Sequence, residues 1–190
     1  GELQLAPAGE TDEELAAAGA RFPGDALERI AGDEVPELAQ LLAVAAGRRA
    51  LRNAALAYIM ALDDSTARAL TFLEFRRAEN MTDAMAALTC LAGSAGAERD
   101  RALSMFYDKW KDEALVVDKW FRVQATWDLP GAIARIEKLV AHPAFDLKNP
   151  NRARSLIQAF CTANPAAFHR SDAAGYVFWA EQVMQIDAIN

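Results

Sequence analysis

One stretch shows how this chain is built: Asn149-Pro150-Asn151-Arg152-Ala153-Arg154-Ser155-Leu156-Ile157-Gln158-Ala159-Phe160. It predicts the start of an α-helix. The Asn149 side chain can cap free backbone amides, and the proline that follows has no amide to leave unpaired. Leu156, Ile157 and Phe160 then form an apolar stripe at helical spacing. The same combination of a polar cap and an apolar stripe recurs along most of the chain.

The charges in this stretch are unusual for a helix start. Arg152 and Arg154 lie within the first turn or so, where the helix dipole is positive and acidic residues are preferred. Two interpretations are open from the residues alone. The arginines are solvated on a surface helix, or they pair with carboxylates elsewhere in the fold or with something anionic outside it.

Outward from this stretch, the chain reads as a succession of short helices. No useful strand-like alternation and no Asn-Gly or Asp-Gly hairpin turn occurs. The clearest stripe lies between residues 48 and 62, with Gly47 predicted to end the preceding helix; its apolar members are Leu51, Ala55, Tyr58, Ile59 and Leu62. The helices expected from apolar spacing and breakers cover about 11–18, 25–31, 36–46, 48–62, 65–77, 80–93, two helices between 96 and 127, 131–142, 149–160 and 171–186.

These elements predict an all-α fold, an irregular superhelical stack of antiparallel helix pairs of the armadillo or HEAT type. Residues 1–23, rich in alanine, glycine and glutamate, are expected to form a lead-in segment. Residues 24–190 are expected to form the helical-repeat domain. Because residues 186–190 end on apolar side chains without a polar capping repeat, we expect this domain to be truncated at its C-terminus.

Composition narrows the class of protein. Hydrophobic residues make up 53% and charged residues 25% of the 190 positions, which is typical of a globular domain. The net charge of −7 argues against nucleic acid or an anionic membrane surface as partner. Two cysteines predict no disulfide framework and favour a reducing, cytoplasmic location. No apolar run reaches the roughly 18 residues of a membrane span.

A search for chemistry finds no self-sufficient catalytic centre. His142 and His169 have no metal-type ligand three or four positions away, and Cys90 and Cys161 form no Cys-x-x-Cys pair. His142 is interpreted as a helix C-terminal residue that interacts with free carbonyls. The segment Asp118-Lys119-Trp120-Phe121 is interpreted as a partly buried ion pair over core aromatics. The aromatic residues expected in the interhelical core are Phe106, Tyr107, Trp110, Trp120, Phe121 and Trp127.

Three runs of residues carry a resemblance to a known family. The first is Glu79-Asn80-Met81-Thr82-Asp83-Ala84-Met85-Ala86-Ala87-Leu88, and the second combines Asp108-Lys109-Trp110 with Leu115-Val116-Val117-Asp118-Lys119-Trp120-Phe121. The third is Asn149 to Leu156 followed by Asn164-Pro165-Ala166-Ala167-Phe168-His169, and Leu51-Arg52-Asn53 fits the same match. Over roughly residues 48–190 the chain resembles the C-terminal domain of bacterial aminopeptidase N, the zinc-dependent alanyl aminopeptidase type.

The resemblance implies a helical domain that caps a catalytic cleft and encloses a chamber for peptides. It implies that zinc, its ligands and the general base belong to a catalytic domain elsewhere in the same polypeptide, with no cofactor in this chain. The partners it implies are that catalytic domain and the peptide substrate. The residues it places at the substrate chamber are Asn149, Asn151, Arg152 and Arg154, with Arg154 facing the chamber near the substrate's C-terminal side and Arg152 acting as a structural partner.

Three functional hypotheses follow. The chain is a non-catalytic C-terminal domain of a zinc aminopeptidase that shapes substrate access. Alternatively, it is a stand-alone helical-repeat scaffold that binds a protein partner, which would call for a polar cap near Asn190. The third hypothesis, an independent enzyme, lacks the ligand and nucleophile patterns that it needs.

Overall fold

The computed structural model describes residues 35–62, 64–127 and 129–189. Its contacts divide the chain into two compact units, residues 1–48 and residues 49–190. Of the first unit, only the beginning of one helix is described. The helices expected at 11–18 and 25–31 and the boundary expected after residue 23 lie outside the described residues.

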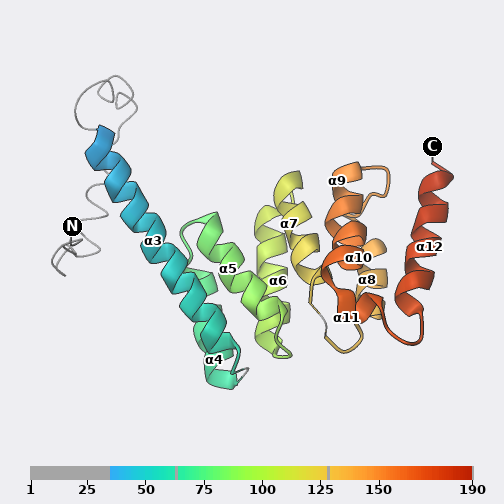
Figure 1. Cartoon of the computed structure of the whole chain (residues 1–190), viewed down its shortest axis with the longest axis horizontal. Helices are drawn as coiled ribbons and strands as arrows, with labels where there is room; N and C mark the ends of the chain where they lie inside the picture. The colour runs from blue at the N-terminus through green and yellow to red at the C-terminus, as the bar shows by residue number, and fades with distance from the viewer. Residues whose placement is uncertain (1–34, 63, 128, 190) are drawn as a thin grey trace, which may run out of the picture. The chain divides into compact units, whose positions relative to one another are not determined.

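Every regular element in the described part of the chain is a helix, as the sequence predicts (Figure 1). The helices are α3 (Val35–Met60), α4 (Ser65–Arg77), α5 (Met81–Ala92), α6 (Ala97–Trp110), α7 (Ala114–Ala125), α8 (Ala132–Val140), α9 (Pro150–Ala153), η1 (Arg154–Gln158), α10 (Ala159–Ala163), α11 (Pro165–Phe168) and α12 (Ala174–Asp187). Polar caps start several of them: Asp64, Asn80, Asn149 and Asn164 each accept a hydrogen bond from a backbone amide of the following turn.

The prediction that Gly47 ends a helix is wrong. The helix α3 runs without interruption from Val35 to Met60. A glycine inside a helix is unfavourable because its backbone loses more freedom than that of other residues, but the cost is only about 1 kcal/mol. The part of α3 that follows Gly47, from Arg48 to Met60, consists mostly of residues with good helix propensity, which offset this cost. A single glycine without a capping arrangement is therefore a weak stop signal.

Within the second unit, the helices pack mainly against helices that are close to them along the chain. Contacts join α4 with α5 and α6, and α5 with α6 and α7. Further along, α7 contacts both α8 and the helix formed by α9, η1 and α10, and α12 contacts α8 and α11. Figure 1 shows this succession from α4 to α12. This arrangement is the stack of helix pairs that the sequence predicts.

The core of the second unit is built from side chains of successive helices. Its largest fully buried members include Phe106, Phe121, Phe160, Leu88 and Ile136. The aromatic run predicted for the core is confirmed for Phe106, Trp120 and Phe121, which are buried, and for Tyr107 and Trp110, which pack against them half-buried. The prediction is wrong for Trp127, which follows the end of α7 and is exposed.

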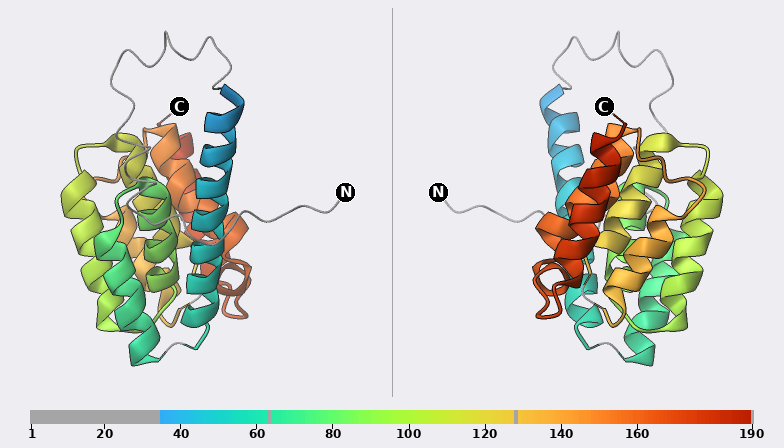
Figure 2. Two further views of the ribbon diagram at one scale, coloured as in Figure 1. Left: turned by 90° about the vertical axis from the view of Figure 1, so that its left-hand side faces the viewer. Right: turned by 90° about the vertical axis from the view of Figure 1, so that its right-hand side faces the viewer.

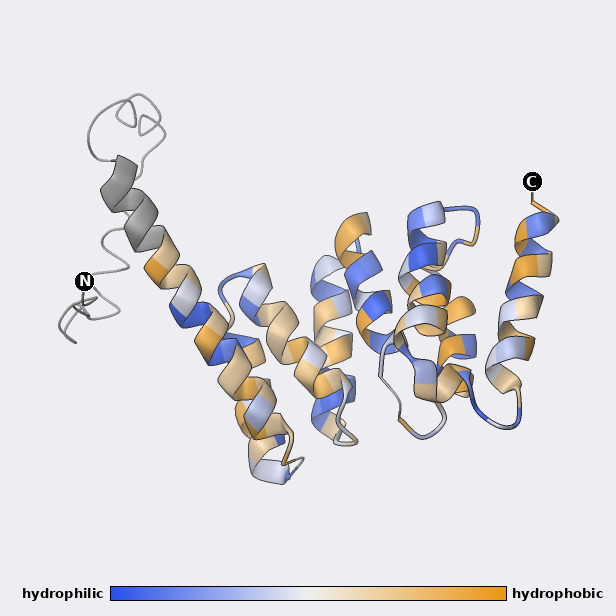
Figure 3. Ribbon diagram, viewed as in Figure 1, coloured by the Kyte–Doolittle hydropathy of each residue, from blue (hydrophilic) through white to orange (hydrophobic). Residues whose placement is uncertain are grey.

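Two apolar stripes face outward. On α3, Leu51 and Tyr58 are exposed, Tyr58 to 81%, as is Leu62 in the turn that follows, whereas Leu56 and Met60 are buried. The predicted stripe between residues 48 and 62 is therefore not the buried face of this helix. On α12, Trp179 and Val183 are exposed on a helix that carries mostly apolar residues (Figure 3). The right-hand view of Figure 2 shows α12 in front of the other helices of the unit.

Two glycine-to-alanine substitutions test these backbone assignments. Nothing lies within 4 Å of a Cβ added at Gly47, so Gly47→Ala should raise the free energy of unfolding of the helix by about 0.5–1 kcal/mol. A Cβ at Gly175 would meet the Phe168 carbonyl oxygen at 2.2 Å, so Gly175→Ala should destabilise by about 1–3 kcal/mol. Urea unfolding followed by circular dichroism measures both changes. A destabilising Gly47→Ala would contradict the continuous helix.

Candidate functional site

The candidate site begins at the cap of the helix that runs from Pro150 to Ala163. The Asn149 Oδ1 atom accepts hydrogen bonds from the amides of Asn151 at 3.0 Å and Arg152 at 3.3 Å. Pro150 occupies the first helical position. This is the helix start that the sequence predicts.

The middle of this helix is a π-turn. The segments α9, η1 and α10 follow one another without a break, and the Ala159 amide donates to the Arg154 carbonyl five residues earlier. Such wide turns insert one residue into an α-helix and are frequent at functional sites. This turn was not predicted from the sequence. The residues that flank it, Ala153 and Ala159, have ordinary helical torsion angles.

Arg152 is buried and pairs with a carboxylate. Its Nη1 atom lies 3.1 Å from Oδ1 of Asp118 on α7, and both side chains are largely excluded from solvent. Its guanidinium carbon also lies 5.1 Å from the centre of the Phe121 ring. Of the two interpretations left open by the sequence, pairing with a carboxylate elsewhere in the fold holds for Arg152.

The prediction that Asp118 forms an ion pair with its neighbour Lys119 is wrong. Lys119 is exposed, and Asp118 turns toward Arg152 instead. Adjacent residues on a helix point about 100° apart, so Asp118 and Lys119 do not face each other. The two paired atoms are close enough for an ion pair, but they lack the alignment of a hydrogen bond. Coulomb attraction and the Phe121 ring therefore carry the contact.

His142 lies beside this pair. Its ring packs against Tyr107, Trp120 and Phe121, with centroids 4.9, 5.2 and 5.9 Å away. Burial and, to a lesser extent, the positive charge of Arg152 lower the pKa of His142. The folded state therefore binds this proton more weakly than the unfolded chain, so it loses stability as the pH falls below the ordinary histidine value of about 6.5.

The interpretation of His142 as a donor to free carbonyls is not what the structure shows. The His142 Nδ1 atom accepts a hydrogen bond from the Ala144 amide at 3.1 Å. The pyrrolidine ring of Pro143 has no amide, so the first amide after the histidine that can donate is that of Ala144. The His142 ring therefore stabilises the turn after α8 by accepting a hydrogen bond within that turn.

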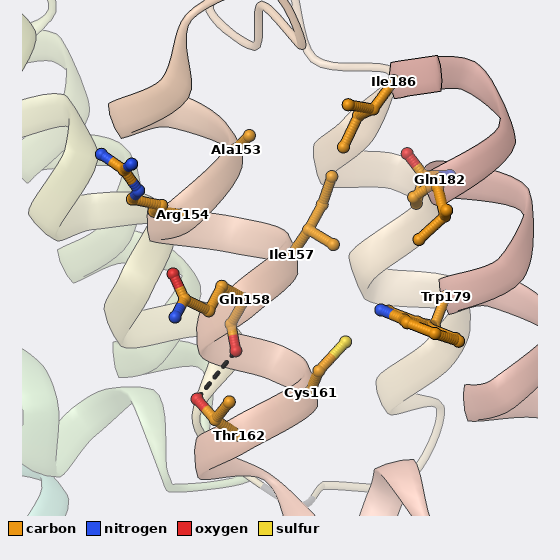
Figure 4. A pocket seen from close by; sticks show the side chains of 10 residues that line it. Ala153, Arg154, Ile157, Gln158, Cys161, Thr162, Trp179, Gln182 and Ile186 are labelled. Atoms are coloured by element: carbon orange, nitrogen blue, oxygen red, sulfur yellow. Dashed lines mark hydrogen bonds between the residues drawn. The ribbon is translucent and has the colours of Figure 1, made fainter. Parts of the chain in front are cut away.

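Arg154 lies on the opposite side of the helix from Arg152. Two helical positions are about 200° apart, so one arginine faces the core and the other faces outward. Arg154 is exposed, and no carboxylate among the described residues pairs with it. Figure 4 shows its guanidinium directed away from α12. Asn151 is also exposed, so the four predicted site residues form no single cluster: Arg152 faces inward, Arg154 outward, and the two asparagines belong to the helix start.

Two further sets of hydrogen bonds between helices, called polar ties below, were not predicted from the sequence. Asn164 is buried and donates from Nδ2 to the carbonyls of Ala125 and Trp127, 3.1 Å away in each case, while its Oδ1 caps α11. The sign of this tie in the sequence is that Asn164 directly precedes Pro165 within an apolar segment. A capping asparagine with a buried amide needs acceptors for its donors, and here they are carbonyls at the end of α7.

The second tie centres on Asp83, which is buried at the start of α5. Its carboxylate accepts hydrogen bonds from Arg52, from Asn53 at 3.0 Å and from Asn80 at 2.8 Å. Arg52 and Asn53 come from α3, so the network joins helices about 30 residues apart along the chain. The runs that carry the family resemblance therefore hold the ties between helices.

A small cavity lies between the Pro150–Ala163 helix and α12 (Figure 4). Its volume is about 290 Å³, and its walls are mostly apolar. Residues from both helices line it: Ala153, Arg154, Ile157, Gln158, Cys161, Thr162, Trp179, Gln182, Val183 and Ile186. The sequence analysis did not anticipate this space.

No metal centre is formed by the part of the chain that the structure describes, since no three histidine, cysteine, aspartate or glutamate side chains come together there. The residues present do not fit a zinc site, which needs three or four such ligands. Among the same residues, no helix has the length and apolar character needed to cross a membrane.

Comparison with known proteins identifies the family to which this helical stack belongs. Residues 12–190 match a family model described as "Domain of unknown function (DUF3458_C) ARM repeats". The chain belongs to the DUF3458_C family. The armadillo-type repeats that this description names agree with the stack of helix pairs.

The relatives of this DUF3458_C domain are aminopeptidases. The chain is 40% identical to aminopeptidase N of Caulobacter vibrioides over 88% of its own length and 20% of that protein. It is 40% identical to aminopeptidase N of Escherichia coli over 75% of its length and 16% of that protein. The resemblance found from the sequence is thereby confirmed, and the chain spans a fifth or less of these relatives.

A solved structure gives the same result for the fold. Aminopeptidase A of Legionella pneumophila, solved in complex with aspartic acid, superposes with a TM-score of 0.71 at 35% identity. The match covers 76% of the DUF3458_C chain and 17% of that protein. The similarity therefore covers one part of an aminopeptidase, and in that part the helical folds agree.

The two arginines offer a matched test of the inward and outward assignments. Arg152→Met leaves Asp118 buried without its cation, so the free energy of unfolding should fall by about 2–4 kcal/mol. The same substitution at exposed Arg154 should change it by less than about 0.5 kcal/mol. Urea titrations of both variants measure the difference. Equal losses would show that the Arg152–Asp118 pair does not stabilise the fold.

Proposed function

We propose that this chain is a non-catalytic helical domain of a zinc aminopeptidase that removes N-terminal residues from peptides. In this role it caps the catalytic chamber, shapes the access of substrate and buries a face against the catalytic domain of the same polypeptide. The observation that carries the proposal is the 40% identity to aminopeptidase N over most of the chain. We also propose a cytoplasmic location.

The orientation of the two arginines supports a division of labour. Arg152 forms an ion pair with Asp118 and so attaches the Pro150–Ala163 helix to α7. Arg154 extends from the same helix into solvent, where its charge can pair with a carboxylate from outside the domain. Arginine suits this task because its planar guanidinium binds a carboxylate through two parallel donors. We assign to Arg154 the contact with the C-terminal side of a peptide in the chamber, near the helix start at Asn149 and Asn151.

Zinc chemistry in the proposed enzyme would take place elsewhere in the polypeptide. There the metal would activate a water molecule for attack on the first peptide bond. The residues of this chain contribute no metal ligands to that step; they enclose the space and orient the far end of the substrate.

A kinetic comparison tests the role of Arg154. In the full-length aminopeptidase, Arg154→Ala should lower kcat/KM for peptides of three or more residues by about tenfold, because one charge-assisted contact is lost. For an alanyl amide of a single residue, kcat/KM should stay within about twofold, since this substrate does not reach Arg154. The matched control is Gln158→Ala, one turn further along the same exposed side. Equal effects on both substrates would assign Arg154 a structural role.

The separation of this domain from the catalytic chemistry is tested with the 190-residue chain alone. After purification with zinc in the buffer, the chain should retain far less than one zinc per molecule and should not hydrolyse alanyl amides. Elemental analysis and a chromogenic amide assay measure these two properties. Zinc-dependent turnover by the pure chain would overturn the proposal.

A further inference from the structure

Two parallel helices, α7 and the Pro150–Ala163 helix, place their exposed rows next to each other. Two contacts fix their alignment. Arg152 pairs with Asp118, and Asn164, just after the second helix, donates to the Ala125 carbonyl at the end of α7. Since the residue numbers of both partners increase together from one contact to the other, the helices run in the same direction. The residues between these two contacts are therefore level with each other.

The exposed cations of the two rows share one direction. Asp118 and Arg152 face each other, and each further residue turns both helices by about 100° in the same sense. Counted in this way, Lys119 and Arg122 on α7 and Arg154 on the other helix point within about 80° of each other. All three are exposed, and Figure 4 shows the Arg154 guanidinium directed away from α12. The three side chains form one surface, called the cationic strip below.

No carboxylate neutralises the cationic strip. Lys119, Arg122 and Arg154 form no ion pair within the described residues. The acid best placed to pair with Arg122 is Asp118, one helical turn earlier on the same side of α7. Asp118 is directed to Arg152 instead, so its charge is balanced inside the domain. The other exposed residues of the two rows are uncharged: Leu115, Asn151, Gln158 and Thr162.

The cationic strip contrasts with the rest of the chain, whose net charge is −7. The described exposed acids nearest to it in the sequence, Glu113 and Asp146, come before the first residues of the two helices. Three neighbouring cations repel one another, and this repulsion is relieved when an anion binds between them. The strip is thus a surface for a negatively charged partner.

Spacing and chemistry define this partner. Packed helices lie roughly 8–10 Å apart, and three residues of an extended peptide span about the same distance. Two acidic side chains of one short peptide therefore reach both helices. Guanidinium and ammonium groups both bind carboxylates, and arginine does so through two parallel donors. The negative charge of the whole chain disfavours a long polyanion such as nucleic acid, so a short acidic peptide is the occupant that fits.

We propose that the cationic strip binds acidic side chains of peptide substrates, so that the aminopeptidase favours peptides with glutamate or aspartate downstream of the residue that it removes. Lys119 and Arg122 bind the side-chain carboxylates, while Arg154 keeps the contact near the C-terminal side of the peptide that is assigned to it above. The inference rests on the proposed function and deepens it, because it names the class of peptide that the domain favours.

The first test uses the 190-residue chain and the probe acetyl-Gly-Glu-Gly-Glu-Gly-amide, in which only the two side-chain carboxylates are charged. Titration at low salt, followed by 1H–15N NMR, should give saturable shifts at the cationic strip, with a Kd on the order of 1 mM. The glutamine counterpart should bind at least about tenfold more weakly, and salt should weaken binding of the glutamate peptide because it screens each charge. Equal binding of the two peptides, or no binding, would overturn the proposal.

Matched charge substitutions locate the binding surface. Lys119→Gln and Arg122→Gln should each weaken binding of the glutamate peptide by about threefold, since each removes one exposed charge pair. Lys138→Gln, at an exposed position on α8, makes the same change in net charge and should leave the Kd unchanged. Equal effects at all three positions would show that only the net charge matters, which would contradict a site at the strip.

The second test measures the full-length aminopeptidase. With Ala-Gly-Glu-Gly-Glu-Gly-amide and its glutamine counterpart as substrates, kcat/KM should favour the glutamate peptide by about fivefold. The double variant Lys119→Gln/Arg122→Gln should bring this ratio close to one through KM, with kcat unchanged. An equal loss with both peptides would instead show that the strip binds an acidic surface of the catalytic domain, and it would overturn the proposal.

The two proposals fail in different ways. Binding of the probe to the 190-residue chain needs no catalytic domain. If the glutamate preference is seen while Arg154→Ala has no selective effect on peptide kinetics, the strip stands and the assignment of Arg154 fails. If Arg154→Ala has its selective effect and no glutamate preference is seen, only the inference about acidic peptides fails.

Discussion

The buried pairing of Arg152 with Asp118 organises the C-terminal half of the described structure. It joins the start of the Pro150–Ala163 helix to α7, with Phe121 and the His142 ring packed around it. Neither charge is stable in this apolar surrounding without the other, because desolvation of an isolated ion costs several kcal/mol. The pair therefore permits only one register of the later helix on α7, and the outward direction of Arg154 depends on that register.

Similar polar ties recur along the stack. Asp83 gathers donors from α3 and from its own helix start, and Asn164 binds carbonyls at the end of α7. In each case a residue that caps or starts one helix also reaches another helix. Apolar packing alone is tolerant of sliding, since many arrangements bury similar areas. Directional polar contacts at the helix starts give the stack its specific arrangement.

The sequence predicts the class of fold and most helix boundaries, because polar caps and prolines are local signals, whereas the isolated Gly47 is too weak a signal to end α3. It fails where the answer depends on a neighbour. The stripe of Leu51, Tyr58 and Leu62 has helical spacing, but spacing alone does not say which face a neighbouring helix covers. The inward position of Arg152 was accessible in principle, since it lies one turn before Leu156 in the same row, whereas the cavity beside α12 depends on the packing angle of that helix and has no local signal.

The tie made by Asn164 has a consequence for how the chain folds. Most contacts of the unit join a helix to one of its next two neighbours, so contact order is low and folding is expected to be fast. The Ala125 carbonyl at the end of α7, however, accepts its hydrogen bond from the Asn164 side chain, 39 residues further along. While a growing chain emerges from the ribosome, the Ala125 carbonyl lacks this donor until Asn164 has been synthesised. The last turn of α7 therefore reaches its final set of hydrogen bonds only after the later helices have been made.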